Sequence, residues 1–154
     1  MDAHLMNALG QAGAFAAIAV ASLGSGLGTG VAGAAAVGAW KKCYAQNKPA
    51  PFQLVVFAGA PLSQTIYGMI LMFLIIGKVN VNPNLWPFYL VFGVLAGLGL
   101  CISSWMQGVA GAGACDAFGD NGKGFVNYLM VLGIIETVSI FVMAFGIVLL
   151  TAIK

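Results

Sequence analysis

The chain has 154 residues, of which 61% are hydrophobic and only 6% are charged, and its mean hydropathy is +1.00. This composition excludes an ordinary soluble domain and indicates an integral membrane protein in contact with lipid. The formal net charge of +2 comes from lysines without any arginine. Because these lysines form no dense basic patch, we expect no nucleic-acid partner.

Four apolar stretches are long enough to cross a bilayer, which takes about 20 residues per helix. They cover residues 11–40, 51–77, 86–118 and 125–151. None shows the alternating pattern of a membrane β-strand, so all four are predicted to be helices. The predicted fold class is an all-α membrane protein with four transmembrane helices.

The loop predicted at residues 41–50 contains three of the six lysines and is closed by Pro49, which cannot continue a helix. By the positive-inside rule, this loop is cytoplasmic. The loop at 78–84 would then lie outside, and the loop at 119–124 would be cytoplasmic. Both termini are therefore expected outside the membrane.

A short internal repeat divides the chain into halves. The sequence Gly-Val-Ala-Gly-Ala occurs at 30–34 and again at 108–112, and Gln64-Thr65-Ile66 matches Glu136-Thr137-Val138. The repeat predicts two tandem helical hairpins, residues 1–78 and 79–154. Glycines crowd the first and third helices, which predicts that these two pack closely on an inner face while the second and fourth form an outer layer.

Glu136, the only glutamate, lies near the middle of the fourth apolar stretch. A charge at the centre of a spanning helix costs roughly 2.5–3.5 kcal/mol on insertion scales, so such a residue is usually paired, neutralised or functional. One alternative is that Glu136 is neutral and only joins helices through Gln64 or Gln107. The repeat, which makes Gln64 the counterpart of Glu136, favours a functional carboxylate.

The second helix carries a polar stripe. Ala60, Ser63, Gln64 and Tyr67 are spaced by three and four residues and share one face. Pro61 removes a helical donor and is expected to loosen the backbone beside this stripe.

With Gln107 and Glu136, the stripe offers one carboxylate, two amide oxygens, a hydroxyl and a backbone carbonyl. Such a set suits Na⁺, a hard cation, whereas a proton needs the carboxylate alone. Four other hydroxyls are expected to bond back to their own helices, namely those of Ser103, Ser104, Thr29 and Thr151. No nucleotide loop or nucleophile–base pair is present, so we expect no catalysis by this chain alone.

Taken together, these features resemble the proteolipid of rotary ATPases, in the duplicated four-helix K or c subunit of V-type and A-type enzymes and its Na⁺-carrying form. The resemblance covers essentially the whole chain. It rests on the doubled hairpin, the glycine-rich helices, Pro61-Leu62-Ser63-Gln64 with Tyr67, Gln107-Gly108, and Glu136-Thr137. It implies a two-layered ring of identical subunits, in a prokaryotic plasma membrane, that carries ions while partner subunits hydrolyse or synthesise ATP.

The resemblance also implies the ion ligands: the backbone oxygen of Ala60 and the side chains of Ser63, Gln64, Gln107 and Glu136, with Tyr67 hydrogen-bonded to Glu136. Serine stands at position 63, where threonine is familiar in the family. Implied partners are a stator a/I subunit that supplies an arginine and a central-stalk subunit that docks on the cytoplasmic loops. The alternatives are the same rotor carrying H⁺, a small dimeric cation-coupled transporter, and a structural protein with four spans.

Overall fold

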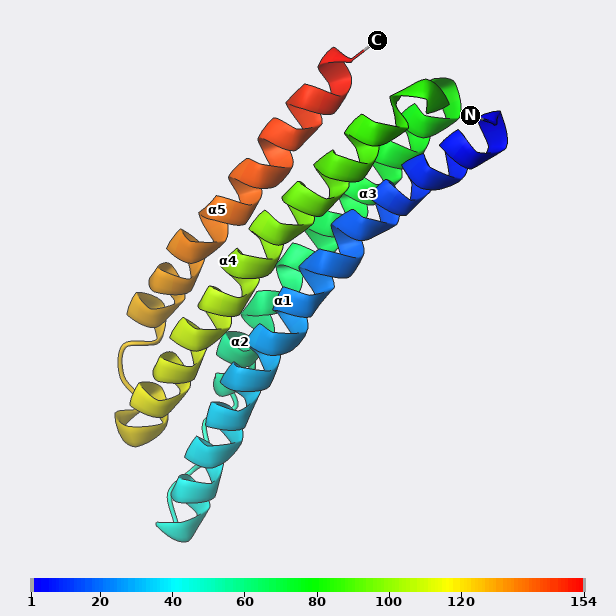
Figure 1. The fold of residues 1–154 in the computed structure, drawn as a ribbon. Coiled ribbons are helices and arrows are strands. Elements are labelled where there is room, and N and C mark those ends of the chain that lie inside the picture. The colour runs from blue at the N-terminus through cyan, green and yellow to red at the C-terminus, as the bar shows by residue number, and fades with distance from the viewer. Residues whose placement is uncertain (1, 154) are drawn as a thin grey trace.

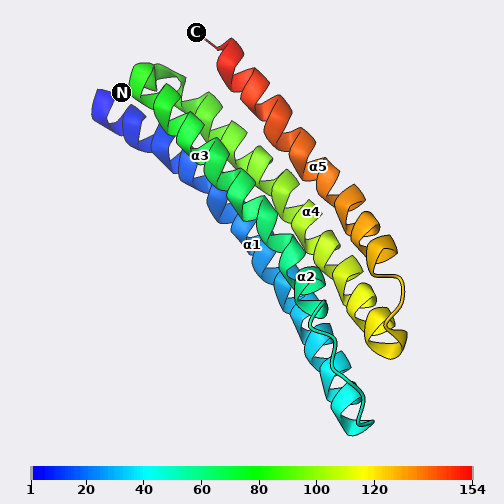
Figure 2. The same cartoon turned by 180° about the vertical axis from the view of Figure 1, so that it is seen from behind.

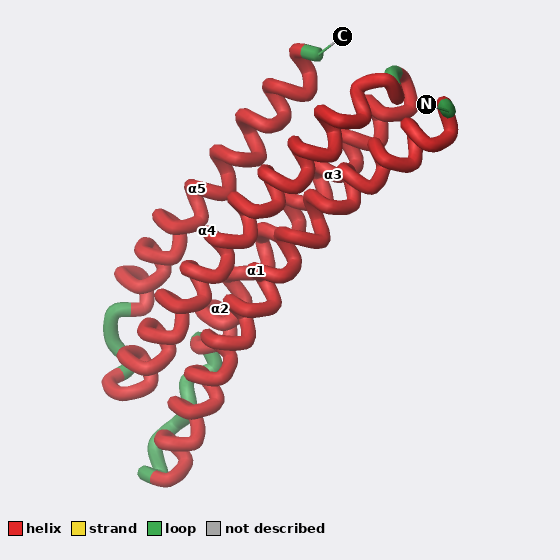
Figure 3. Tube along the Cα trace, in the orientation of Figure 1, coloured by secondary structure: helices red, strands yellow, loops and turns green. Residues whose placement is uncertain are grey.

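The structure is a computed structural model that describes residues 2–153, so Met1 and Lys154 of the two predicted hairpins lie outside the described residues. Its elements are α1 (Ala3–Ala45), α2 (Leu54–Gly59), the 3₁₀ turn η1 (Ala60–Leu62), α3 (Ser63–Val81), the 3₁₀ turn η2 (Pro83–Leu85), α4 (Trp86–Asn121) and α5 (Phe125–Ala152). Over these residues the fold is helical throughout (Figure 3), with four helical segments long and apolar enough to span a membrane. The predicted all-α membrane fold is confirmed.

The helix boundaries differ from those of the predicted apolar stretches: α1, α3 and α4 end later, at Ala45, Val81 and Asn121, whereas α2 begins later, at Leu54 rather than at 51. The non-helical connections between these helices are residues 46–53, Asn82 and 122–124, whereas the predicted loops were 41–50, 78–84 and 119–124. Hydrophobicity marks only the part of a helix that lies in lipid, whereas its backbone hydrogen bonds continue into water. The 43 residues of α1 make a helix roughly 65 Å long, about twice the hydrocarbon core of a bilayer.

The second span is interrupted at Pro61. The loosened backbone predicted beside the polar stripe is confirmed: α2 ends at Gly59 and α3 begins at Ser63, with η1 between them. Just before the interruption, α2 packs tightly against α4, because a Cβ added at Gly111 would lie 2.8 Å from the carbonyl oxygen of Phe57.

Glycines bring the backbones of α1 and α4 into direct contact. A Cβ added at Gly93 would lie 1.8 Å from the carbonyl oxygen of Gly13, and one added at Gly108 would lie 2.2 Å from the Cα of Gly28. No side chain larger than hydrogen fits at these crossings. The predicted close pairing of the first and third helices is confirmed, and Figures 1 and 2 show α3 and α5 running alongside this pair.

Other glycines of α1 face away from α4. A Cβ at Gly26, Gly30 or Gly33 would meet no atom within 4 Å in the described chain. Within the single chain, the glycines of α1 therefore do not all contact α4. Helical periodicity turns these positions to another side of α1, where they leave a strip of small residues open.

Left-handed glycines set the turn between α4 and α5. The helix α4 ends where Gly122 adopts a φ of 66° and its N–H donates to the carbonyl of Phe118 at 2.8 Å. Gly124, with a φ of 83°, precedes the first residue of α5. Glycine adopts this conformation without the steric cost that a Cβ imposes, so the chain reverses within three residues, 122–124.

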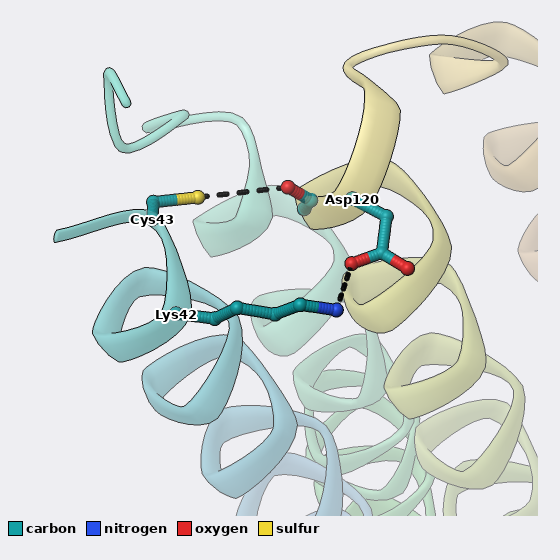
Figure 4. A network of polar contacts seen from close by, with 4 residues as sticks. Lys42, Cys43 and Asp120 are labelled. Carbon is teal, nitrogen blue, oxygen red and sulfur yellow. Dashed lines mark hydrogen bonds and ion pairs between the residues drawn. The ribbon is translucent and has the colours of Figure 1, made fainter. Parts of the chain in front are cut away.

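Both chain ends lie at one end of the bundle, and the connections 46–53 and 122–124 lie at the other (Figure 1). At the connection end, Lys42 of α1 forms an ion pair with Asp120 of α4, and the Cys43 thiol donates to the carbonyl of Gly119 at 3.5 Å (Figure 4). The two inner helices are thus joined by polar contacts beyond their glycine crossings.

We expect Lys42→Met to leave the melting temperature of the detergent-solubilised protein nearly unchanged. The side chains of Lys42 and Asp120 are 52% and 48% exposed, and water screens exposed ion pairs so that they contribute little to stability. Thermal unfolding followed by circular dichroism measures this. A loss of stability comparable to that of a glycine-crossing variant would show that the pair is structurally essential.

Candidate ion-binding site

Glu136 lies near the middle of α5, partly buried, and both oxygens of its carboxylate accept hydrogen bonds. The Tyr67 hydroxyl donates to Oε1 at 2.6 Å, and Nε2 of Gln107 donates to Oε2 at 3.4 Å. Within residues 2–153, the one ion pair joins Lys42 and Asp120, at an end of the helices. The carboxylate is therefore held by neutral donors, without a cationic side chain beside it.

Two buried amides connect the second span to α5. Nε2 of Gln64 donates to Oε1 of Gln107 at 2.8 Å, and Nε2 of Gln107 also donates to the carbonyl of Leu132 at 3.0 Å. Both glutamines have 0% of their surface exposed. Buried amides are costly unless they are hydrogen-bonded, so these bonds hold α3, α4 and α5 together around the carboxylate.

Three oxygens converge at the interruption of the second span. The Ser63 hydroxyl lies 3.2 Å from the carbonyl oxygen of Ala60 and 3.2 Å from Oε1 of Gln64. The single proton of the Ser63 hydroxyl can bond only one acceptor at a time. The three oxygens therefore have lone pairs that are not all used by hydrogen bonds among them. Hydroxyl, amide and carbonyl oxygens are the types of ligand that hard cations bind.

All six predicted site residues are brought into one connected set of hydrogen bonds. The set runs from the Ala60 carbonyl through Ser63, Gln64 and Gln107 to Glu136, and ends at Tyr67. Its oxygens are one carboxylate and neutral hydroxyl, amide and carbonyl groups, the types that hard cations prefer. Clusters of three or more His, Cys, Asp or Glu, which could hold a metal ion in another way, are absent from the described part of the chain.

The predictions for the serines of α4 are wrong. Ser103 donates to the carbonyl of Ile135 in α5 at 3.0 Å, and Ser104 donates to the carbonyl of Pro61 at 2.6 Å. Both serines bond across helices because α4 lies between α5 and the turn η1. The signal that could have found them is their position one helical turn before Gln107.

By contrast, the threonine predictions are confirmed, because each threonine bonds within its own helix. Thr29 donates to Ser25 at 2.7 Å, and Thr151 donates to Ile147 at 2.9 Å. These hydroxyls lie away from the buried contacts of α4 and take no part in the site.

The Tyr67→Phe substitution should weaken cation binding at this site while the protein still folds. It removes a hydrogen bond to a charged acceptor, which contributes about 1.5–3 kcal/mol, so affinity should fall about tenfold or more. The measurement is the Na⁺ concentration that half-protects Glu136 from a carbodiimide. Tyr128→Phe is the matched control, because Tyr128 packs against Phe57 with ring centroids 6.2 Å apart; an equal effect of the two variants would contradict a specific role for Tyr67.

Two comparisons with known proteins find similar sequences. The family model of the ATP synthase C subunit matches residues 90–149, the segment that carries Gln107 and Glu136. Over 147 residues, the chain is 30% identical to the A-type ATP synthase K subunit from Methanocaldococcus jannaschii, with 94% of this chain covered. The chain is therefore similar to ATP synthase proteolipids. It spans about 63% of the length of that relative.

Proposed function

We propose that this chain is the rotor proteolipid of an A/V-type rotary ATPase and carries Na⁺ across the membrane on Glu136. The observation that carries the proposal is a single mid-helix carboxylate, held by Tyr67 and Gln107 within a connected set of neutral oxygens. The chain itself is non-catalytic. Partner subunits hydrolyse or synthesise ATP, and rotation couples that reaction to ion movement.

The transport step follows from the cost of a bare charge in lipid. A bound cation neutralises Glu136, so the loaded site can face the hydrocarbon; after the ion leaves, the carboxylate needs another positive partner. The chain contains no arginine. An arginine of the stator a/I subunit supplies that charge in this scheme, and a central-stalk subunit docks on the connections at 46–53 and 122–124.

The glycine repeat supports assembly into a ring. Gly108 and Gly111 of α4 pack against the first half of the chain, whereas their repeat counterparts Gly30 and Gly33 meet no atom within 4 Å. If the halves are equivalent, the open glycines of α1 contact α4 of the next copy in the same way. Such a head-to-tail contact repeats around an axis and closes into a ring.

The presence of one carboxylate per two hairpins determines how many ions the rotor carries per turn. Gln64 occupies the position that matches Glu136 in the first hairpin, so each pair of hairpins carries one ion. Fewer ions then cross per turn of a ring of given size. This ratio favours ATP-driven pumping against a steep gradient, although it also permits ATP synthesis.

Labelling with a carboxylate-specific carbodiimide tests the ion. We expect the reagent to modify Glu136 in the assembled protein, and we expect Na⁺ at constant pH to slow the reaction, because the bound ion occupies the carboxylate. Labelling that is insensitive to Na⁺ would contradict Na⁺ carriage and favour the H⁺-carrying rotor.

Two other functions give different results. A small dimeric cation-coupled transporter would have the mass of two copies in detergent, whereas the rotor requires a much larger assembly. A structural protein, in which Glu136 only joins helices, would leave ion transport intact in the Glu136→Gln variant. Complex mass and transport together therefore separate the three classes.

A further inference from the structure

Two adjacent serines of α4 reach the two outer elements that carry the proposed ion ligands. Ser103 donates to the carbonyl of Ile135 at 3.0 Å, and Ile135 immediately precedes Glu136. Ser104 donates to the carbonyl of Pro61 at 2.6 Å, inside the turn η1 that contains Ala60. The two bonds thus fix both sides of the site to the same turn of α4.

Ser103 bonds a carbonyl that a serine of α5 could otherwise use. A helical serine commonly donates to the carbonyl four residues earlier, as Ser22 does to Ile18 at 2.8 Å. For Ser139 that carbonyl belongs to Ile135, which Ser103 occupies. The Ser139 hydroxyl has no hydrogen-bond partner within the described chain.

Burial of these hydroxyls excludes an external partner. Ser139 and Ser104 have 0% of their surface exposed, and Ser103 has 4%. A neighbouring copy or a lipid headgroup therefore cannot reach Ser139. A buried hydroxyl without a partner costs free energy. The fold therefore forms the Ser103 bond between α4 and α5 while the Ser139 hydroxyl stays without a partner.

We propose that Ser103 and Ser104 are positioning residues that set the spacing between Glu136 and the Ala60–Ser63 turn, and so determine the affinity of the ion site. Ser103 fixes α5 at the residue before the carboxylate. Ser104 fixes the interrupted backbone that presents the Ala60 oxygen, and it also bonds Ser25 of α1 at 3.1 Å. The inference rests on the proposed role of Glu136 as the ion carrier.

The unpartnered Ser139 makes Ser103→Ala a well-tolerated probe. When Ser103 is removed, the Ser139 hydroxyl can take the Ile135 carbonyl, so no buried group loses its only partner. The fold should persist while α5 loses its connection to α4 at this point. Adding Ser139→Ala should alter the Ser103→Ala variant more than it alters the wild type, a coupling that a double-mutant cycle detects.

The test uses the assembled protein in membranes, with carbodiimide labelling of Glu136 as the readout. Ser103→Ala and Ser104→Ala should each raise the Na⁺ concentration for half-protection about three- to tenfold, as expected for loss of one hydrogen bond. The melting temperature of the Ser103→Ala assembly should match that of Ser22→Ala, the control whose hydroxyl bonds within its own helix. Should Ser104→Ala fail to assemble, Ser103→Ala carries the test alone.

If the Na⁺ concentration for half-protection is unchanged in the variants, with or without a lower melting temperature, the positioning role is overturned. If Na⁺ does not protect even the wild type, the Na⁺ part of the proposed function fails separately. The positioning role is then judged by the pH of half-maximal labelling. A change in that pH in the α4 variants, but not in Ser22→Ala, supports it, and no change overturns it.

Discussion

Glu136→Gln should abolish ion transport while the protein still inserts and assembles. The amide keeps the shape of the side chain and an oxygen for the Tyr67 hydroxyl, which lies 2.6 Å from Oε1 in the wild type. The substitution also removes a mid-membrane charge that costs roughly 2.5–3.5 kcal/mol on insertion scales. Transport by the reconstituted complex and the size of the purified assembly measure the two effects.

Asp120→Asn is the matched control for this loss of charge. Asp120 pairs with Lys42 at the connection end, where its side chain is 48% exposed, so transport should persist. Transport that survives Glu136→Gln would contradict the ion-carrier role and leave the carboxylate as a connector of helices. Loss of assembly in Glu136→Gln would show that the carboxylate is needed for folding.

Gly108→Ala should destabilise the protein by about 3 kcal/mol, near the upper end of the usual range for overpacked cores. The new Cβ would lie 2.2 Å from the Cα of Gly28 and 2.3 Å from its carbonyl oxygen. Because these are backbone atoms, no side chain can rotate away and the helices must separate. Thermal unfolding and the yield of folded protein in detergent measure the effect.

Gly77→Ala provides the contrasting control. Gly77 lies in α3, and a Cβ there meets no atom within 4 Å. Alanine is favoured over glycine inside a helix by roughly 0.5–1 kcal/mol, so this variant should be at least as stable as the wild type. Equal stability of the Gly108 and Gly77 variants would contradict direct backbone contact between α1 and α4.

The residues of the candidate site could be selected from the sequence because their spacing and chemistry are local properties. Three- and four-residue spacing placed Ala60, Ser63, Gln64 and Tyr67 on one face, and the structure joins Ser63 to Ala60 and Gln64, and Tyr67 to Glu136. Pro61 indicated a loosened backbone in its helix. The cost of a charge in lipid identified Glu136 as a candidate functional residue, and this argument needs no knowledge of its neighbours.

What could not be predicted depends on how the helices dock. The sequence does not say which carbonyl of a neighbouring helix lies beside Ser103 or Ser104, so their bonds across helices were missed. Likewise, Gly28 and Gly30 look equivalent in the sequence, yet only Gly28 meets α4. The helix ends were placed too early because hydropathy reports the lipid boundary and not the last hydrogen-bonded turn.

A high-resolution structure of the isolated assembly in Na⁺ tests the role of Glu136 as the ion carrier of a rotor most directly. We expect a closed ring of copies with one ion density per chain, surrounded by oxygens of Ala60, Ser63, Gln64, Gln107 and Glu136. An assembly of two copies, or a ring in which no ion density lies beside Glu136 at saturating Na⁺, would contradict this role.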